Sequence, residues 1–174
     1  MTARQTLKRL QGFTLIEILL VVAMISILAV AVFVALNPAK RIIDSKNARR
    51  QNDVDSILSA VHQYIVDQKG ALPAGLTAGM DEAQLGTGDA VDCAAALTLN
   101  GCTTTADTAC ADLTTPLAKY LKTIPVDPTA GTTYASEKTG YSIEVDANGI
   151  VTVRACAAET PAGESPAIVI SASR

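Results

Sequence analysis

Near its N-terminus the chain has a long apolar run that is almost free of charge. From Phe13 to Leu36 there are 24 residues, and Glu17 is the only charged one among them. As a helix, a run of this length spans roughly 36 Å, which is enough to cross a hydrocarbon core of about 30 Å. The pattern therefore predicts a helix that lies in lipid or in another apolar environment.

An amphipathic helical pattern follows over residues 37–70. Its apolar residues recur at helical spacing, at Val54, Ile57, Leu58, Val61 and Ile65. Asn37-Pro38 separates this pattern from the apolar run. Because proline removes a helical hydrogen bond, we expect a kink or a melted turn there and not a domain boundary. The helix is expected to end near Lys69-Gly70.

The remaining sequence predicts a loop, a short helix and a small sheet. Residues 71–112 are rich in Ala, Gly, Thr and Asp and predict a long surface loop, and residues 113–124 predict a short amphipathic helix. Strands are expected at Thr132–Ser136, Tyr141–Val145, Ile150–Ala155 and Ala167–Ser171. Asn148-Gly149 is a strong hairpin signal. The whole pattern predicts an α+β fold, with a long N-terminal helix packed on a small antiparallel sheet.

Charge is distributed unevenly along the chain. Residues 1–12 hold Arg4, Lys8 and Arg9 and no acidic residue, although the whole chain has a net charge of −3. A basic start before an apolar run is typical of a targeting segment. Only 3% of the residues are aromatic and none is tryptophan. Few stacking platforms and a negative net charge argue against nucleic acid as a partner.

Glu17 distinguishes the possible roles of the apolar run. An ordinary signal peptide has an apolar region of about 7–15 residues, shorter than this one, although Ala29-Val30-Ala31 would suit a signal peptidase. A plain membrane anchor is the other alternative. Neither needs a carboxylate, which is costly inside a bilayer and usually has a partner there. A helix that assembles with copies of itself does need one, because the acid can pair with a cation on its neighbour.

The sequence GFTLIE at residues 12–17, between a short basic leader and the apolar run, resembles the class III signal of type IV pilins and type II secretion pseudopilins. In that family a prepilin peptidase cuts after the glycine and methylates the new N-terminal residue. The resemblance assigns these roles to Gly12 and Phe13. It assigns to Glu17 the role of neutralising the terminal amine of a neighbouring subunit during assembly.

The resemblance implies four parts: a leader (1–12), a transmembrane and filament-core helix (13–36), an amphipathic helix entering the head (37–70) and a globular head (71–174). It implies a structural subunit of a type IV pilus or similar filament, polymerised through the N-terminal helix, and not an enzyme. The implied partners are copies of the chain, the prepilin peptidase, the inner-membrane assembly platform and the membrane. The implied location is the inner membrane with an extracytoplasmic head, and a periplasmic or extracellular filament after assembly.

Two alternatives stay open at this stage. Residues 124–128 (IPVDP) resemble the segment that leads into the sheet of major pseudopilins, which favours a pseudopilin acting in protein export. The cysteine-containing loop favours a displayed pilin instead. A membrane-anchored binding domain that uses this N-terminus only for export is the further alternative.

Four cysteines lie beyond the apolar run: Cys93, Cys102, Cys110 and Cys156. An even number after an export segment predicts two disulfides in an oxidising compartment. Of the three possible pairings we prefer Cys93–Cys102 with Cys110–Cys156, which closes one local loop and ties down the tail. The chain has no Cys-x-x-Cys pair and His62 is its single histidine, which argues against a zinc site.

Other candidate chemistry is sparse. Asp127, Asp146 and Asn148 offer oxygen ligands for calcium, which major pseudopilins bind in the head, but turn chemistry also explains Asp146 and Asn148. We therefore expect no cofactor, with calcium as the one alternative. His62 lies on the amphipathic helix with no nucleophile in a recognisable context, and no glycine-rich phosphate loop is present, so we expect no catalysis.

Overall fold

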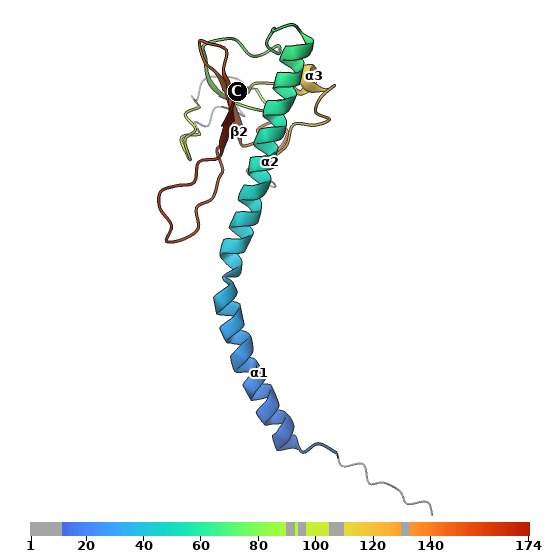
Figure 1. Ribbon diagram of the computed structural model, residues 1–174, viewed down its shortest axis with the longest axis vertical. Helices are drawn as coiled ribbons and strands as arrows, with labels where there is room; N and C mark the ends of the chain where they lie inside the picture. The colour runs from blue at the N-terminus through green and yellow to red at the C-terminus, as the bar shows by residue number, and fades with distance from the viewer. Residues whose placement is uncertain (1–11, 90–92, 94–96, 105–109, 130–132) are drawn as a thin grey trace, which may run out of the picture. The chain divides into compact units, whose positions relative to one another are not determined.

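The computed structural model describes the chain except for residues 1–11, 90–92, 94–96, 105–109 and 130–132. The chain divides into two compact units, Met1–Pro38 and Ala39–Arg174. The elements in chain order are α1 (Leu15–Leu36), α2 (Pro38–Asp67), β1 (Met80–Gln84), α3 (Thr114–Leu117), β2 (Tyr141–Val145), β3 (Val151–Ala155) and β4 (Ser171–Ser173) (Figure 1). The predicted α+β class is confirmed.

Asn37 ends α1 and separates it from α2. Its backbone is left-handed, with φ 40° and ψ 71°, and its N–H donates to the carbonyl oxygen of Val34. Asparagine adopts this conformation more readily than most residues. Pro38 is then the first residue of α2, a position where its missing N–H costs nothing. The expected interruption of the helix is confirmed, but the boundary between the two compact units also lies here, between Pro38 and Ala39.

The end of α2 is also set by residues with positive φ. The helix stops at Asp67, and Lys69 (φ 56°) and Gly70 (φ 98°) follow it. The N–H of Gly70 donates back to the carbonyl oxygen of Ile65 at 2.8 Å. Such a turn satisfies the last carbonyls of a helix. It lies where the sequence placed the helix end, to within a few residues.

The sheet has four strands in the order β1-β2-β3-β4, and every neighbouring pair is antiparallel. The hairpin between β2 and β3 is confirmed, with Val145 opposite Val151. In its turn the Asp146 carboxylate accepts the N–H groups of Asn148 and Ile150, at 2.8 and 2.7 Å. Local turn chemistry therefore fixes the register of the central strand pair.

Four predictions about elements are wrong. No strand forms over residues 133–136, the described part of the first predicted strand, and β4 begins only at Ser171. The helix predicted over residues 113–124 is limited to α3. Strand β1 lies inside the predicted loop. It was not predicted because its sequence MDEAQ has no alternating apolar pattern. It forms a strand by pairing with β2, and not through the β propensity of its own residues.

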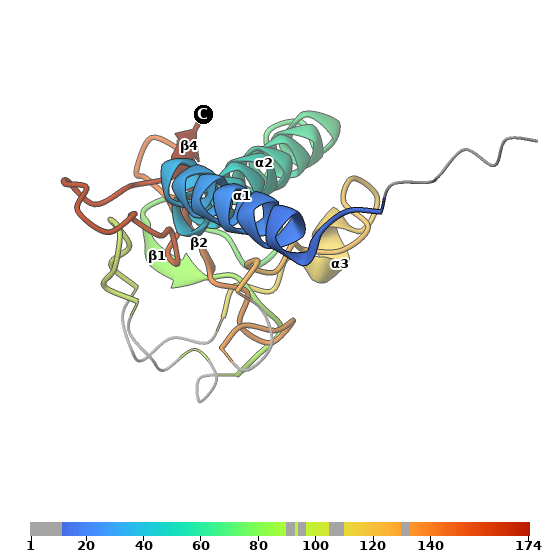
Figure 2. The same cartoon turned by 90° about the horizontal axis from the view of Figure 1, so that it is seen from below.

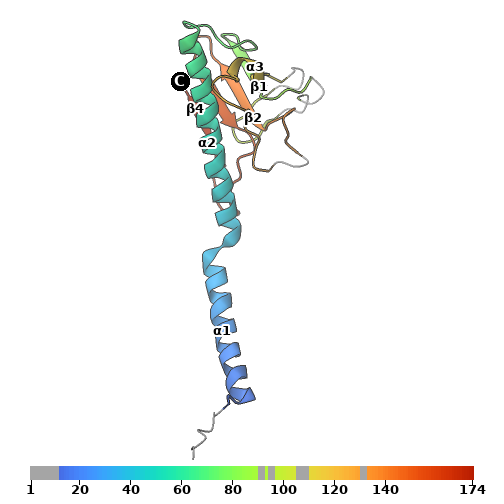
Figure 3. The same ribbon diagram turned by 90° about the vertical axis from the view of Figure 1, so that its right-hand side faces the viewer.

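The core of the head lies between α2 and the sheet. On α2 the predicted face is buried, with Val54, Ile57 and Val61 fully inaccessible. On the sheet Ile143 and Val153 are equally inaccessible and belong to the same cluster. Seen from below in Figure 2 and from the side in Figure 3, β1, β2 and α3 lie on one side of α2. The helix thus forms one layer of the head and the sheet forms the other.

The two predicted disulfides form, but the preferred pairing is wrong. The structure pairs Cys93 with Cys110 and Cys102 with Cys156, and the Cα atoms are 5.4 and 5.5 Å apart. The reason is the position of Asn100, whose side-chain amide donates to the carbonyl oxygens of Cys156 (3.0 Å) and Ala158 (2.8 Å). These bonds hold the loop that carries Cys102 against the chain that leaves β3.

Candidate functional site

Thr14 begins α1 and places Glu17 in its first turn. The Thr14 backbone is extended, with φ −81° and ψ 152°, and its hydroxyl accepts the N–H of Glu17 at 3.3 Å. This is the geometry of a helix N-cap, and threonine three residues before glutamate is the sequence of a capping box. The negative charge of Glu17 is therefore also favoured by the helix dipole.

Gly12 and Phe13, the predicted cleavage site, precede this cap and are both exposed. Phe13 keeps 78% of its surface exposed. A Cβ atom built on Gly12 would have no other atom within 4 Å. Among the described residues, nothing therefore covers the peptide bond between Gly12 and Phe13. Cleavage there, methylation of Phe13 and the pairing of Glu17 stay predictions.

No residue of α1 is buried. The exposed fractions of its large apolar side chains run from 48% at Val21 to 82% at Leu15. Among the described residues, one helical stretch is long and apolar enough to cross a membrane, Leu15–Asp67, and its most apolar part is fully unburied. Burial of apolar surface is worth about 25 cal/mol for each Å². This helix therefore requires lipid or other apolar helices around it.

Comparison with known families identifies this segment. Residues 7–33 match the family model of the prokaryotic N-terminal methylation motif. The chain carries a prepilin-type signal. Such a signal is the cleavage and methylation site of type IV pilins and pseudopilins, and it points to a structural subunit and not to an enzyme. No curated protein and no solved structure gave a match to the chain.

The prepilin-type signal implies processing by prepilin peptidase and assembly into a filament. Together with the apolar α1, it fits a membrane-anchored protein that carries a head. The basic leader residues Arg4, Lys8 and Arg9 lie outside the described residues. Gly12, Phe13 and Glu17 all lie within the matched range.

The head contains a buried-charge cluster formed by Lys46, Asn47, Arg50, Asp127 and Glu159. Arg50 and Asp127 are both fully inaccessible, and Arg50 Nε and Nη2 donate to the two carboxylate oxygens of Asp127 at 2.7 and 3.1 Å. Arg50 Nη2 also donates to Glu159 at 3.1 Å, and Nη1 to Asn47 Oδ1 at 2.8 Å. Lys46 pairs with the same Glu159 oxygen at 3.1 Å. The cluster ties α2 to two distant segments of the head.

Burial and pairing shift the pKa values of this cluster in opposite ways. Burial by itself lowers the pKa of the Arg50 guanidinium, but the hydrogen bonds and charges of Asp127 and Glu159 outweigh it and raise that pKa. Burial by itself raises the pKa of Glu159, but Lys46 and Arg50 outweigh it and lower that pKa. Arg50 and Glu159 are therefore both charged at neutral pH.

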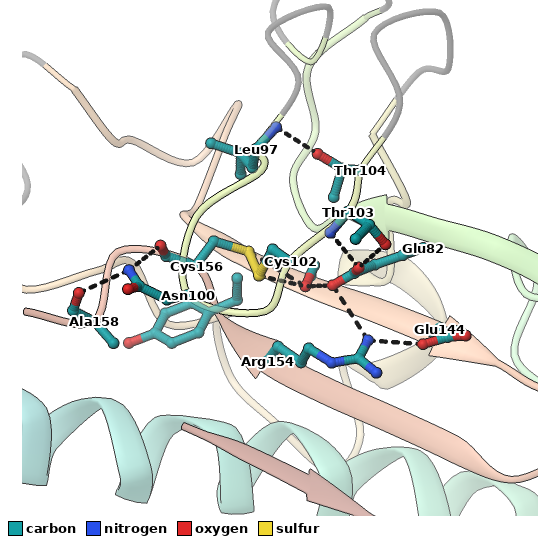
Figure 4. The surroundings of a disulfide bond; sticks show 12 residues. Glu82, Leu97, Asn100, Cys102, Thr103, Thr104, Glu144, Arg154, Cys156 and Ala158 are labelled. Carbon is teal, nitrogen blue, oxygen red and sulfur yellow. Dashed lines mark hydrogen bonds and ion pairs between the residues drawn. A yellow bond between two sulfur atoms is a disulfide. The ribbon is translucent and has the colours of Figure 1, made fainter. Parts of the chain in front are cut away.

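A second group of polar side chains surrounds the Cys102–Cys156 disulfide (Figure 4). The Glu82 carboxylate, on β1, accepts the N–H and the hydroxyl of Thr103 at 2.6 and 2.9 Å. It also accepts the hydroxyl of Ser142 and pairs with Arg154 Nη1 at 3.3 Å. The Ser142 oxygen lies 3.3 Å from each of the two sulfur atoms. Ser142 thus links the disulfide to a buried carboxylate.

The residues considered for calcium lie in two different settings. Both carboxylate oxygens of Asp127 are bonded to Arg50. Asp146 is half-buried and Asn148 is exposed, and they hydrogen-bond to each other in the β2–β3 turn. The N–H of Ile150 and the groups of Asn148 lower the pKa of Asp146. A cation at Asp127 would have to displace a guanidinium. The expectation of no cofactor, with calcium as the one alternative, stays a prediction.

Sequence reasoning missed Arg50 and Glu82, two buried charged residues of the head. Each faces a partner that is distant in the sequence: Arg50 is 77 residues from Asp127, and Glu82 is 60 residues from Ser142. One sequence signal was available for Arg50. It lies four residues before Val54, on the apolar face of the predicted helix, where a charge is out of place unless it is paired.

Proposed function

We propose that this protein is the structural subunit of a type IV pilus-like filament, assembled from copies of the chain through their α1 helices. The observation that carries the proposal is the complete exposure of an apolar helix that starts with a prepilin-type signal. A solvent-facing helix of this kind cannot persist in water. In the membrane lipid covers it, and in a filament neighbouring α1 helices do.

In this proposal prepilin peptidase cuts the bond between Gly12 and Phe13, and the new amine of Phe13 is methylated. The N-cap at Thr14 then places the amine and the Glu17 carboxylate at the same end of α1. When one subunit leaves the membrane to join the filament, its Glu17 meets the amine of a neighbouring subunit. Two charges that are costly in an apolar core are thereby neutralised together.

The competing explanation is that Glu17 only stabilises the first turn of its own helix. A carboxylate at that position contributes about 0.3–1 kcal/mol through the helix dipole. Loss of so little stability cannot melt a 22-residue apolar helix in a membrane. If Glu17 acts within its own helix, removing it will therefore leave assembly intact.

Glu17→Ala distinguishes these explanations, and Ser26→Ala is the matched control because Ser26 is the other polar side chain within α1 and bonds only to the carbonyl oxygen of Val22. We expect Glu17→Ala to abolish filaments sheared from the cell surface while the processed protein accumulates in the membrane. Ser26→Ala should assemble normally. Filaments from Glu17→Ala at the level of the unsubstituted chain would refute the role of Glu17.

The mature N-terminus tests the proposal as a whole. Sheared material should begin at Phe13 and carry one extra methyl group by mass spectrometry. The same end found only in membranes would favour the alternative of a type II secretion pseudopilin. A start at Val32, after Ala29-Val30-Ala31, would leave an exported domain without a filament.

A further inference from the structure

Asparagine precedes glycine at two places in the head. The first pair, Asn100-Gly101, lies in the loop that carries Cys102, and the second pair, Asn148-Gly149, lies in the turn between β2 and β3. Because glycine has no Cβ atom, its backbone nitrogen can approach the side chain of the preceding asparagine without steric hindrance. Such pairs are therefore the places where a chain is most prone to deamidation.

We propose that Asn148 is a site of spontaneous deamidation in the folded protein, and that the fold protects Asn100 from the same reaction. The backbone nitrogen of Gly149 gives up its proton and attacks the side-chain carbonyl carbon of Asn148, and ammonia leaves. Water then opens the resulting cyclic imide at either carbonyl, which yields aspartate or isoaspartate in place of Asn148. The net reaction consumes water, releases ammonia and involves no oxidation or reduction.

The exposure of the hairpin turn favours the reaction at Asn148. Asn148 and Gly149 are both exposed, so water reaches the imide. A Cβ atom built on Gly149 would meet no described atom within 4 Å, whereas one built on Gly101 would lie 3.2 Å from a methyl carbon of Val169. The backbone around Gly149 therefore has room to move as the ring closes.

Asp146 restrains the two reacting groups while the turn is closed. The side-chain amide of Asn148 donates to Asp146 Oδ2 at 3.1 Å, and the N–H of Gly149 donates to the carbonyl oxygen of Asp146 at 3.0 Å. Attack requires the nitrogen and the carbonyl carbon to approach each other in a defined orientation. The turn must therefore open first, and an exposed turn at the end of a hairpin opens without unfolding the core.

Asn100 is held more firmly than Asn148. Its backbone is left-handed, with φ 52°, and its side-chain amide donates to the carbonyl oxygens of Cys156 at 3.0 Å and Ala158 at 2.8 Å. Releasing this amide separates the loop from the chain that leaves β3, and the Cys102–Cys156 disulfide opposes that separation. Openings that disrupt more of the fold are rarer. We therefore expect the amide of Asn100 to persist.

Deamidation changes the hairpin in two ways. A carboxylate replaces the amide that donates to Asp146, so two negative charges face each other where a hydrogen bond stood. Isoaspartate also adds a methylene group to the backbone, within the turn that sets the register of β2 and β3. Aged copies of the protein thus carry a more negative hairpin than newly made copies.

The test follows both asparagines in one sample of the full-length protein in detergent, held at mildly alkaline pH and physiological temperature for several weeks. Trypsin releases them in separate peptides, residues 139–154 and residues 70–119, and mass spectrometry measures the fraction of each asparagine that has lost its amide. Digestion in heavy-oxygen water marks any conversion that happens during the digestion itself. We expect Asn148 to convert to aspartate and isoaspartate while Asn100 stays unchanged. An intact Asn148, or equal conversion of the two residues, would overturn the proposal.

The same measurement on the reduced chain in guanidinium chloride shows whether the fold causes the difference. In the unfolded chain each asparagine precedes a glycine in open backbone, and we expect the two to convert at similar rates. An Asn100 that stays intact in the unfolded chain would overturn its protection by Cys156 and Ala158.

Asp146→Ala tests the restraint on Asn148. Asp112→Ala is the matched control, because the Asp112 carboxylate accepts the N–H of Thr114 at 2.9 Å in a similar turn that contains no asparagine. Removal of hydrogen bonds to a charged acceptor should raise the rate at Asn148 about tenfold, and Asp112→Ala should leave that rate unchanged. Equal rates in Asp146→Ala and the unsubstituted protein would overturn the role of Asp146. None of these outcomes depends on filament formation.

Discussion

Replacing Arg50 with methionine is expected to destabilise the head severely, although Arg50 is not part of the prepilin-type signal. The substitution leaves Asp127 fully buried without its guanidinium partner, and it also removes the bonds to Asn47 and Glu159. Breaking a buried ion pair by removing one partner costs about 3–5 kcal/mol. A domain of this kind has a total stability of about 5–15 kcal/mol.

Arg49→Met is the matched control. Arg49 precedes Arg50 on the same helix, but 63% of its side chain is exposed and its Nε is 3.7 Å from Asp53. Exposed pairs contribute about 0.2–1 kcal/mol. Arginine and methionine have similar helix propensities, so the two variants differ mainly in the burial of the lost charge.

Urea unfolding of the full-length protein in detergent, followed by the near-ultraviolet circular dichroism of its tyrosines, measures the difference. With a slope of about 2 kcal/mol per M, Arg50→Met should lower the midpoint by roughly 2 M, and Arg49→Met by a small fraction of that. The double variant Arg50→Met/Asp127→Leu should recover much of the loss, because apolar pairs often replace buried ion pairs without cost. Equal midpoints for Arg50→Met and Arg49→Met would refute the reasoning.

Two further predictions concern the same region of the head. The folded state holds the pKa of Glu159 below its ordinary value of 4.5, so this carboxylate stabilises the head above that pH, and its contribution is lost as the pH falls through the lowered pKa. Between pH 6 and pH 3 the melting temperature of Glu159→Gln should therefore decline less steeply than that of the unsubstituted protein. Identical slopes for the two proteins would contradict this role of Glu159. Tyr141→Phe removes a 2.7 Å hydrogen bond to Asp53 and should cost about 1–3 kcal/mol in urea unfolding; an unchanged midpoint would contradict this.

The parts of the fold that the sequence predicted correctly depend on residues close to one another in the chain. The break at Asn37-Pro38 follows from two adjacent residues with special backbone requirements, and the β2–β3 hairpin from Asn148-Gly149. The apolar face of α2 follows from helical spacing. Each signal is complete within a few residues, so no tertiary information is needed to interpret it.

The parts that the sequence did not predict depend on contacts between distant segments. Strand β1 becomes a strand because β2 offers hydrogen bonds to it, and Glu82 on it is buried because Ser142, Thr103 and Arg154 surround it. The disulfide pairing follows in the same way from Asn100, which no spacing between cysteines reveals.

The sequence by itself determined that α1 is an apolar helix with a prepilin-type signal, because hydrophobicity, length and a six-residue motif are properties of a single continuous segment. Only the tertiary structure decided how the head is held together. Arg50 and Asp127 are 77 residues apart, and each is tolerable in the core only because the fold brings the other within 3 Å. A buried charge is stabilised by a partner in space, and its position in the sequence does not identify that partner.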